Sequence, residues 1–144
     1  MSLAKAKGGF TLIEMMAVML IVAMVASLAI ASTPGSGRAG LKAVTMQAAA
    51  LLRREREGAI LTGGDRRVSL DGARRVLIGE SGDEVAIPRD VTVDMLGADA
   101  GSIPAVFFHA DGASSGAALR FSREMAEYEI RVNWYSGGIS VKAP

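Results

Sequence analysis

Residues 8–31 read GGFTLIEMMAVMLIVAMVASLAIA, and this stretch decides how the rest of the chain is interpreted. Between Phe10 and Ala31 the only charged residue is Glu14. An apolar helix of about 20 residues is long enough to cross the hydrocarbon core of a bilayer. An ionisable side chain within such a helix is costly and therefore indicates a functional site. We expect residues 10–31 to form a transmembrane helix that serves export or assembly rather than soluble catalysis.

The first 31 residues fit three kinds of N-terminal segment. Ala29-Ile30-Ala31 matches the cleavage site of a secretory signal peptide, but the apolar run exceeds the usual core of about 7–15 residues. A plain membrane anchor explains the length of the run but explains neither Glu14 nor the Gly9–Phe10 junction. The third kind is a leader over residues 1–9 that is cut at this junction on the cytoplasmic side. The apolar run then remains in the mature subunit.

The charges that flank the apolar run indicate its orientation. Lys5 and Lys7 precede it, and the next charge after Glu14 is Arg38. Positive residues favour the cytoplasmic side of a membrane segment. We therefore expect a single pass through the inner membrane, with the N-terminus in the cytoplasm. The C-terminal domain would then lie in the periplasm of a Gram-negative cell.

The composition excludes several functions. The chain has 144 residues, with 16 Lys and Arg against 15 Asp and Glu, and no Cys. A net charge of +1 gives no strong attraction to nucleic acid. Without Cys there is neither a disulfide framework nor a thiolate metal site. The sequence also lacks a Gly-Lys-Ser/Thr phosphate-binding loop, so ATP hydrolysis is not expected.

The apolar run is followed by STPGSG at residues 32–37. Pro34 cannot donate a backbone hydrogen bond and disfavours helical geometry at the residue before it. Gly35 and Gly37 add backbone freedom. We expect the helix to break here, and the break serves either as a functional hinge or as a simple linker.

Residues 38–61 show the apolar spacing of an amphipathic helix. The apolar positions are Leu41, Val44, Ala48, Leu51, Leu52, Ala59 and Ile60. Such a stripe commonly packs on the domain that follows. The charged run over residues 53–57 interleaves Arg with Glu, which favours a solvated helix face over a phosphate-binding patch.

Beyond the helix the pattern changes to short strands separated by turns, which predicts a β-rich globular domain over residues 62–144. Asp71-Gly72 is typical of a hairpin turn. The alternation from Glu127 to Tyr135 predicts a strand that buries one face, with Trp134 on the buried side. Tyr135 falls on the other side and is a candidate interface residue.

Residues 9–14, GFTLIE, resemble the signature of type IV prepilins and type II secretion pseudopilins. The resemblance implies that a prepilin peptidase cuts after Gly9 and methylates the new amine of Phe10. It also implies that Glu14 meets the amine of a neighbouring subunit during filament assembly. A buried carboxylate is tolerated when paired and costly alone, so Glu14 would set the register of docking. The alternative is that Glu14 reaches the lipid headgroups near the helix start.

The order of the later motifs is similar to that of the GspH/FimT family. These motifs are residues 56–60 at the helix–strand junction, residues 107–121 around Asp111-Gly112, and residues 128–141 around a turn at 136–138. The implied fold is α+β, with a long N-terminal hydrophobic helix and a C-terminal antiparallel β-domain of two packed sheets. The implied function is a minor pseudopilin of the type II secretion system. It would be a tip component that primes the pseudopilus for export of folded proteins across the outer membrane.

The resemblance also implies partners. These are a prepilin peptidase, other minor pseudopilins, the major pseudopilin and an inner-membrane assembly platform. The alternative is a FimT-like minor pilin that primes type IV pili or takes part in DNA uptake. DNA binding requires a clustered basic face, whereas Lys142 is the only charged residue in the tail at residues 138–144. We therefore favour secretion and expect no nucleic-acid partner.

One group of residues invites a catalytic interpretation: His109, Asp111, Ser114 and Ser115. A Ser-His-Asp site needs a base that contacts the nucleophile and an acid that orients the base. Four residues around one apparent turn do not supply that arrangement, and Asp111 before Gly112 is typical of turn chemistry. A lone His also gives no metal-ligand spacing. We expect no enzymatic activity, no cofactor and no metal site.

Overall fold

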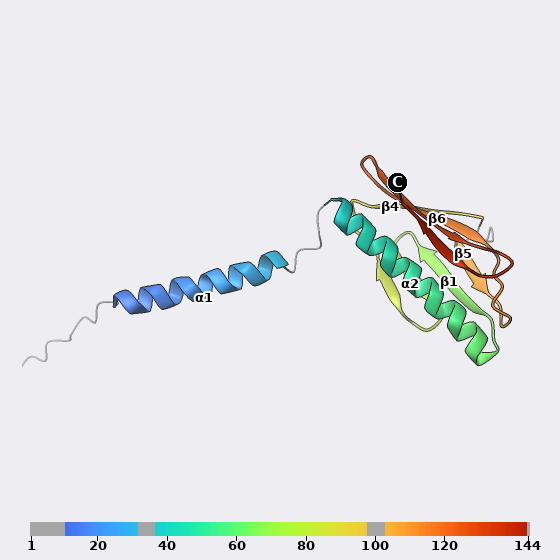
Figure 1. Ribbon diagram of the computed structural model, residues 1–144, viewed down its shortest axis with the longest axis horizontal. Helices are drawn as coiled ribbons and strands as arrows, with labels where there is room; N and C mark the ends of the chain where they lie inside the picture. The colour runs from blue at the N-terminus through green and yellow to red at the C-terminus, as the bar shows by residue number, and fades with distance from the viewer. Residues whose placement is uncertain (1–10, 32–36, 98–102, 144) are drawn as a thin grey trace, which may run out of the picture. The chain divides into compact units, whose positions relative to one another are not determined.

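The first helix, α1 (Leu12–Ala31), has apolar residues around its whole circumference. The computed structural model describes residues 11–31, 37–97 and 103–143, and α1 belongs to a unit distinct from the rest of the chain (Figure 1). Large apolar side chains of α1 are exposed, with Leu12 at 83% and Leu20 at 71%. This helix therefore offers its apolar surface to its surroundings.

The predicted transmembrane segment and the predicted hinge extend past the two ends of α1. No helix within the described ranges is both long and apolar enough to cross a membrane. The predicted transmembrane segment begins at Phe10, which lies outside the described residues. Pro34 and Gly35 of the predicted hinge also lie outside them.

The second helix, α2 (Arg38–Thr62), forms one side of the domain core. It starts after Gly37 and ends at Gly63, which adopts the left-handed conformation common just past helix C-termini. Leu and Ala, both strong helix formers, dominate its buried face. The buried apolar residues of α2 are Leu41, Val44, Ala48, Ala49, Leu51, Leu52 and Ala59.

Two antiparallel sheets of four strands complete the domain. The first sheet has the strand order β3-β2-β1-β5 and contains β1 (Arg66–Asp71), β2 (Val76–Gly79), β3 (Glu84–Ala86) and β5 (Ala105–Phe108). The second has the order β4-β6-β7-β8 and contains β4 (Thr92–Leu96), β6 (Ala117–Arg123), β7 (Ala126–Val132) and β8 (Ile139–Lys142).

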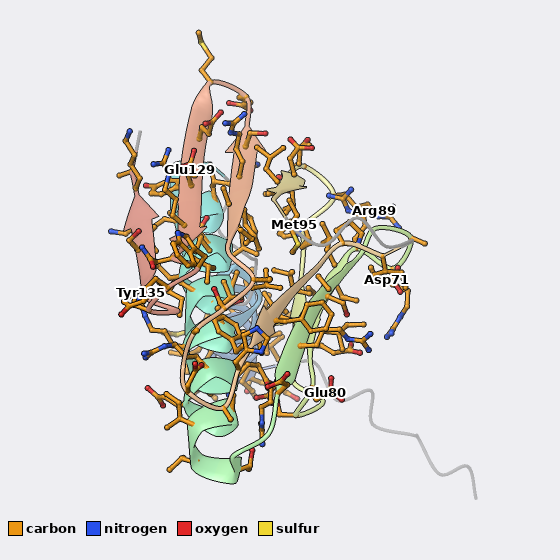
Figure 2. All side chains as sticks on the ribbon, turned by 90° about the vertical axis from the view of Figure 1, so that its right-hand side faces the viewer. Asp71, Glu80, Arg89, Met95, Glu129 and Tyr135 are labelled. Atoms are coloured by element: carbon orange, nitrogen blue, oxygen red, sulfur yellow. The ribbon has the colours of Figure 1, made fainter. Side chains whose placement is uncertain are left out.

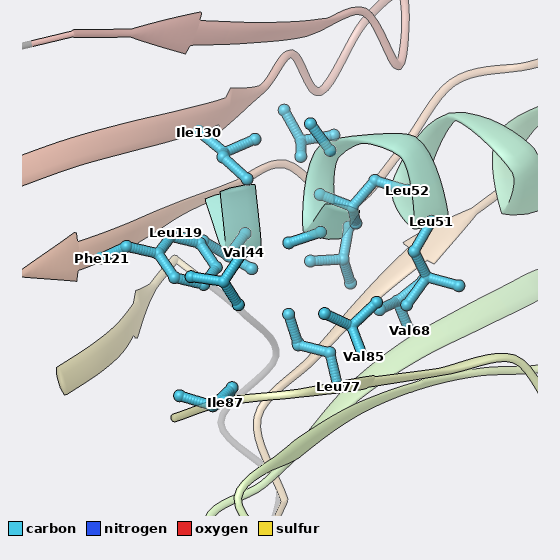
Figure 3. Packing of buried hydrophobic residues seen from close by; sticks show 14 of the residues in the cluster. Val44, Leu51, Leu52, Val68, Leu77, Val85, Ile87, Leu119, Phe121 and Ile130 are labelled. Carbon is cyan, nitrogen blue, oxygen red and sulfur yellow. The ribbon is translucent and has the colours of Figure 1, made fainter. Parts of the chain in front are cut away.

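The core lies where α2 meets both sheets (Figure 3). Val44 and Leu52 of α2 belong to the same buried cluster as side chains from each sheet. The first sheet contributes Val68, Leu77, Val85, Val106 and Phe108, and the second contributes Leu119, Phe121, Ile130 and Val132. This arrangement confirms the predicted α+β fold class with two antiparallel sheets.

The turn between β1 and β2 lies at the predicted Asp71-Gly72 hairpin. Asp71 pairs with Val76, so the turn has four residues, 72–75. The Asp71 carboxylate accepts a hydrogen bond from the amide of Arg74 at 2.9 Å, and Arg75 takes the positive φ of 54°. The hairpin predicted at Asp71-Gly72 is therefore confirmed, and the Asp71 side chain organises its four-residue turn.

Candidate functional site

The N-terminal motif builds a capped helix start. The carbonyl of Thr11 accepts hydrogen bonds from the amides of Glu14, at 3.1 Å, and Met15, at 3.2 Å. The Thr11 hydroxyl also accepts a hydrogen bond from the Glu14 amide at 3.3 Å. A Thr followed three residues later by Glu is the capping-box pattern, and the helix dipole favours an acid in the first turn. The Thr-x-x-Glu spacing over residues 11–14 is a signal in the sequence from which this cap could have been predicted.

The residues predicted for processing and docking surround this helix start. Glu14 is exposed on α1 beside apolar side chains such as Ile13, which is 76% exposed. Gly9 and Phe10 lie outside the described residues. Cleavage at Gly9–Phe10, methylation of Phe10 and docking by Glu14 therefore stay predictions.

Gly37, the last residue of the predicted hinge, is held by the domain. Its carbonyl accepts hydrogen bonds from the amides of Gly40, at 3.1 Å, and Leu41, at 3.3 Å. The guanidinium of Arg123 donates to the same carbonyl at 3.3 Å. The hinge prediction therefore depends on the residues before Gly37.

One guanidinium joins three segments that are far apart in the sequence. Arg56 Nε donates to the carbonyl oxygens of Gly112, at 3.2 Å, and Ser136, at 3.1 Å. Gly112 lies in the turn after β5, and Ser136 lies in the turn between β7 and β8. Each of the three segments belongs to one of the motifs that resemble the GspH/FimT family. Because Arg56 contacts both turns, the three motifs depend on one another in the folded domain.

The two turns joined by Arg56 are packed too closely for larger residues. Gly112 and Gly137 have φ values of 86° and 61°, where other residues are strained. A Cβ on Gly137 would overlap the carbonyl of Gly112. The Asn133 side chain accepts hydrogen bonds from the amides of Tyr135, at 2.9 Å, and Ser136, at 3.0 Å. This tight pair of turns fixes the backbone that carries the neighbouring aromatic residues.

Trp134 lies on this turn and is exposed, not buried. Its exposed fraction is 67%, and that of Tyr135 is 76%. The predicted burial of Trp134 is wrong because β7 ends at Val132 and Asn133 starts the turn, so the strand alternation stops before Trp134. The two rings meet edge to face with centroids 5.7 Å apart. Figure 2 shows Tyr135 on the side of the second sheet, away from Asp71 and Glu80 on the side of the first.

The prediction of a solvated helix face over residues 53–57 is wrong for Glu55 and Arg56. Glu55 is fully buried and pairs with Arg66 at 3.3 Å. It also accepts hydrogen bonds from the amide and hydroxyl of Ser81, which follows β2. The prediction fails at Glu55 because the first sheet supplies partners for its carboxylate, and a buried charge is tolerated when paired.

A groove of about 720 Å³ lies beside Trp134 on the second sheet. Part of its lining is one row of residues in register across the four strands: Leu96, Ala118, Arg131 and Ser140. Gly97, Gly116 and Ala117 also line it, and these small residues leave the space open. The groove and the exposed aromatic pair form a continuous surface through Trp134.

The residues considered for catalysis have structural contacts instead. The Ser114 hydroxyl donates to the carbonyl of Asn133 at 3.0 Å, and the Ser115 hydroxyl accepts from the amide of Phe107 at 3.1 Å. Asp111 accepts a hydrogen bond from the amide of Ala113 at 2.9 Å, and His109 Nδ1 lies 3.1 Å from a carboxylate oxygen of Asp65. The hydrogen bonds of the two Ser hydroxyls go to backbone groups, whereas the His109 ring faces Asp65. In the part of the chain that the structure describes, no group of three or more His, Asp or Glu residues is placed to hold a metal ion.

Charges on the second sheet are paired in a row. Arg120 contacts Glu127 at 3.1 Å and Glu129 at 3.8 Å, and Arg131 contacts the same Glu129 carboxylate. The hydrogen bond from Arg131 holds the pKa of Glu129 below its usual value, and the charges of Arg131, Arg120 and Lys142 act in the same direction. Basic side chains in this row are therefore partly neutralised by neighbouring carboxylates.

Comparison with known proteins gives matches to both parts of the chain. Residues 4–30 match the family model of the prokaryotic N-terminal methylation motif. The chain is similar to the type II secretion system protein H of Xanthomonas campestris pv. campestris. The two are 31% identical over 139 residues, which cover 91% of this chain and 80% of that protein.

Two solved structures share the fold. The minor pseudopilin EpsH of Vibrio cholerae matches with a TM-score of 0.59 and 18% identity, covering 72% of this chain and 96% of EpsH. The type IV minor pilin FimU of Pseudomonas aeruginosa matches with a TM-score of 0.56 and 15% identity, covering 74% of this chain and 94% of FimU. At these identities the matches establish the fold alone, which secretion and pilus subunits share.

The match in sequence separates these two groups of subunits. The relative at 31% identity is a secretion protein, and the match covers most of both chains. The methylation motif at residues 4–30 agrees with it. The chain therefore belongs to the type II secretion system protein H family.

Proposed function

We propose that this chain is a tip component of the type II secretion pseudopilus and primes its assembly for export of folded proteins across the outer membrane. The observation that carries this proposal is the exposed apolar surface of α1, which includes Leu12 and Leu20. An exposed apolar surface of this extent requires a bilayer or other apolar helices to cover it. A subunit that leaves the membrane for a filament exchanges the first environment for the second.

Processing at the N-terminus prepares the subunit for this exchange. A prepilin peptidase cuts between Gly9 and Phe10 and methylates the amine of Phe10, which leaves residues 10–31 as a membrane anchor. The N-terminus faces the cytoplasm and the C-terminal domain lies in the periplasm. The match of residues 4–30 to the methylation motif supports this scheme, and the Thr11 cap supports a helix that starts directly after the new N-terminus.

Glu14 then sets the axial position of the subunit in the filament. On a surface of apolar residues, an unpaired carboxylate is penalised once apolar neighbours surround it. The positive amine of a neighbouring subunit's Phe10 relieves that penalty when the two helices have the correct offset. The energy for extraction comes from the inner-membrane assembly platform, because the chain carries no phosphate-binding loop.

The domain supplies the specific contacts with other minor pseudopilins and with the major pseudopilin. Trp134 and Tyr135 are the candidate contacts because both are exposed on a turn fixed by Arg56. Exposed aromatic residues on a rigid backbone are frequent anchors of protein interfaces. The domain does this without enzymatic activity, cofactor or nucleic acid. The pairing of Arg120 and Arg131 with carboxylates supports the last point, since DNA binding favours unpaired cations.

Substitution of Glu14 tests the proposal in cells that carry the secretion system. We expect Glu14→Ala to be processed like the wild type, with mass spectrometry showing a methylated N-terminal Phe10 in both. The variant should lose crosslinks to neighbouring pseudopilins and should reduce secretion. Glu57→Ala removes an exposed carboxylate from α2 and is the matched control.

Two outcomes would contradict the proposal. A mature chain that begins at Ser32 would exclude retention of α1 in the subunit. Normal crosslinking and secretion by Glu14→Ala would exclude the docking role of the carboxylate while leaving cleavage at Gly9–Phe10 intact.

A further inference from the structure

The turn between β6 and β7 presents an exposed methionine. Arg123 pairs with Ala126 across the hairpin, so the turn consists of Glu124 and Met125. Met125 is 98% exposed, more than any other large apolar residue described. Glu124 adopts a φ of 53°, a left-handed conformation that is costly for residues other than Gly. The hairpin therefore holds an apolar side chain in solvent at the expense of backbone strain.

This turn is fixed to the first residues of the domain. Arg123 donates to the carbonyl of Gly37 at 3.3 Å and forms an ion pair with Asp90 at 2.5 Å. A small hollow of about 210 Å³ lies between the turn and the start of α2. It is lined by Gly37, Leu41 and residues 123–126. The Met125 turn and the point at which the chain enters α2 thus form one end of the domain.

Chain length connects this end to the anchor. Five residues, 32–36, separate Ala31 from Gly37. A chain of that length cannot carry Gly37 more than about 20 Å from the residue at which the anchor ends. If residues 10–31 anchor the subunit in the inner membrane, as proposed above, Gly37 stays close to the bilayer surface.

We propose that, before assembly, the Met125 turn rests on the periplasmic surface of the inner membrane, with the Met125 side chain in the headgroup region. This inference depends on the membrane anchoring in the proposed function. Exposed Lys42 follows Leu41, which lines the hollow, and exposed Arg89 precedes Asp90, whose charge is paired with Arg123. With Glu124 as the opposing charge, these residues leave a net positive end, which suits anionic lipid headgroups.

The anchor at residues 10–31 allows a single apolar side chain to keep the turn in contact with the membrane. A single Met gives too little buried apolar area to bring a free domain to a membrane, since stable attachment takes two signals. Here residues 10–31 supply the first signal and hold Met125 at a high effective concentration beside the surface. The contact would orient the domain before the subunit is extracted into the filament, and it would be lost on extraction.

Site-specific fluorescence of the full-length chain tests the contact. The chain has no natural Cys, so Met125→Cys labels uniquely with nitrobenzoxadiazole. The chain is reconstituted in vesicles of phosphatidylethanolamine and phosphatidylglycerol that contain a headgroup-nitroxide lipid. Leu61→Cys is the matched control, because Leu61 is 85% exposed near the other end of α2.

We expect emission at position 125 to shift to the blue and to be quenched by the nitroxide several times more strongly than emission at position 61. Equal, water-like emission and equal quenching at the two positions would overturn the inference and leave the anchor intact. A blue shift at position 125 without quenching would indicate contact with another copy of the chain and would also overturn it. Failure of the chain to float with the vesicles would reject the anchor itself, and the inference with it.

Discussion

The two helices of this chain differ in whether their apolar side chains are exposed or buried. Leu20 of α1 is 71% exposed, whereas Leu52 of α2 is fully buried against the sheets. A helix that is apolar all round must be covered by something other than its own domain, whereas an amphipathic helix is covered by the domain that it packs on. The same residue types therefore form the domain core in α2 and an exposed apolar surface in α1.

The same substitution in each helix gives the largest expected contrast. Leu52→Ala should lower the free energy of unfolding of the domain by about 2–5 kcal/mol, because it leaves a cavity in the core. Leu20→Ala should change it by less than about 0.5 kcal/mol, because it removes no contact within the domain. Urea unfolding of the full-length chain in detergent measures both. Equal losses would show that α1 and the domain fold as one cooperative unit.

Within α2, Arg56 can be compared with Arg53, since only one of the two lies on the exposed face. Arg56→Met keeps the apolar stem but removes the donor to Gly112 and Ser136. We expect a loss of about 1.5–3 kcal/mol, the contribution of a hydrogen bond from a charged group, because the two carbonyls share the single N–H of Arg56 Nε. Arg53→Met, on the exposed face, should cost less than about 0.5 kcal/mol.

Hydrogen exchange adds a local measurement for Arg56. The amide of Gly137, which donates to the carbonyl of Asn133, should exchange faster in Arg56→Met because the turn loses its support. Unchanged stability and unchanged exchange would remove Arg56 from its role in holding the two turns.

The smallest expected effect comes from Glu129 and depends on pH. Its folded pKa lies below the usual value near 4.5, first because of the hydrogen bond from Arg131. The carboxylate therefore stabilises the fold above that value, and the contribution is lost as the pH falls through the lower, folded pKa. The stability difference between the wild type and Glu129→Gln should be constant near neutral pH and should shrink below about pH 4.5. A difference that grows on acidification would show the opposite sign of linkage.

Much of the fold was predictable from local patterns. The spacing of Leu41, Val44 and Ala48 predicted a helix that packs on the domain, and the short alternating runs predicted antiparallel strands. Trp134 was placed wrongly because alternation cannot tell where a strand ends, and here the Asn133 side chain begins the turn. Such an ending depends on a side-chain hydrogen bond rather than on periodicity.

Some residues of the candidate site were predictable from the sequence and others were not. The spacing of Gly9, Phe10 and Glu14 pointed to processing and docking without any knowledge of contacts. By contrast, nothing in the charged run at residues 53–57 indicated that Glu55 is buried and that Arg56 joins two distant turns. Their neighbours in space lie outside the run, so the sequence predicted a solvated face.

The sequence by itself determined that this chain carries an apolar helix with one acid near its start and a methylation motif over residues 4–30, because motif, length and charge are properties of consecutive residues. Only the tertiary structure decided that Arg56 holds the turns beside Trp134 and that Arg123 ties Met125 to the start of α2. Those contacts join residues that are far apart along the chain. Their energies depend on distance and burial, which exist only once the two sheets have packed on α2.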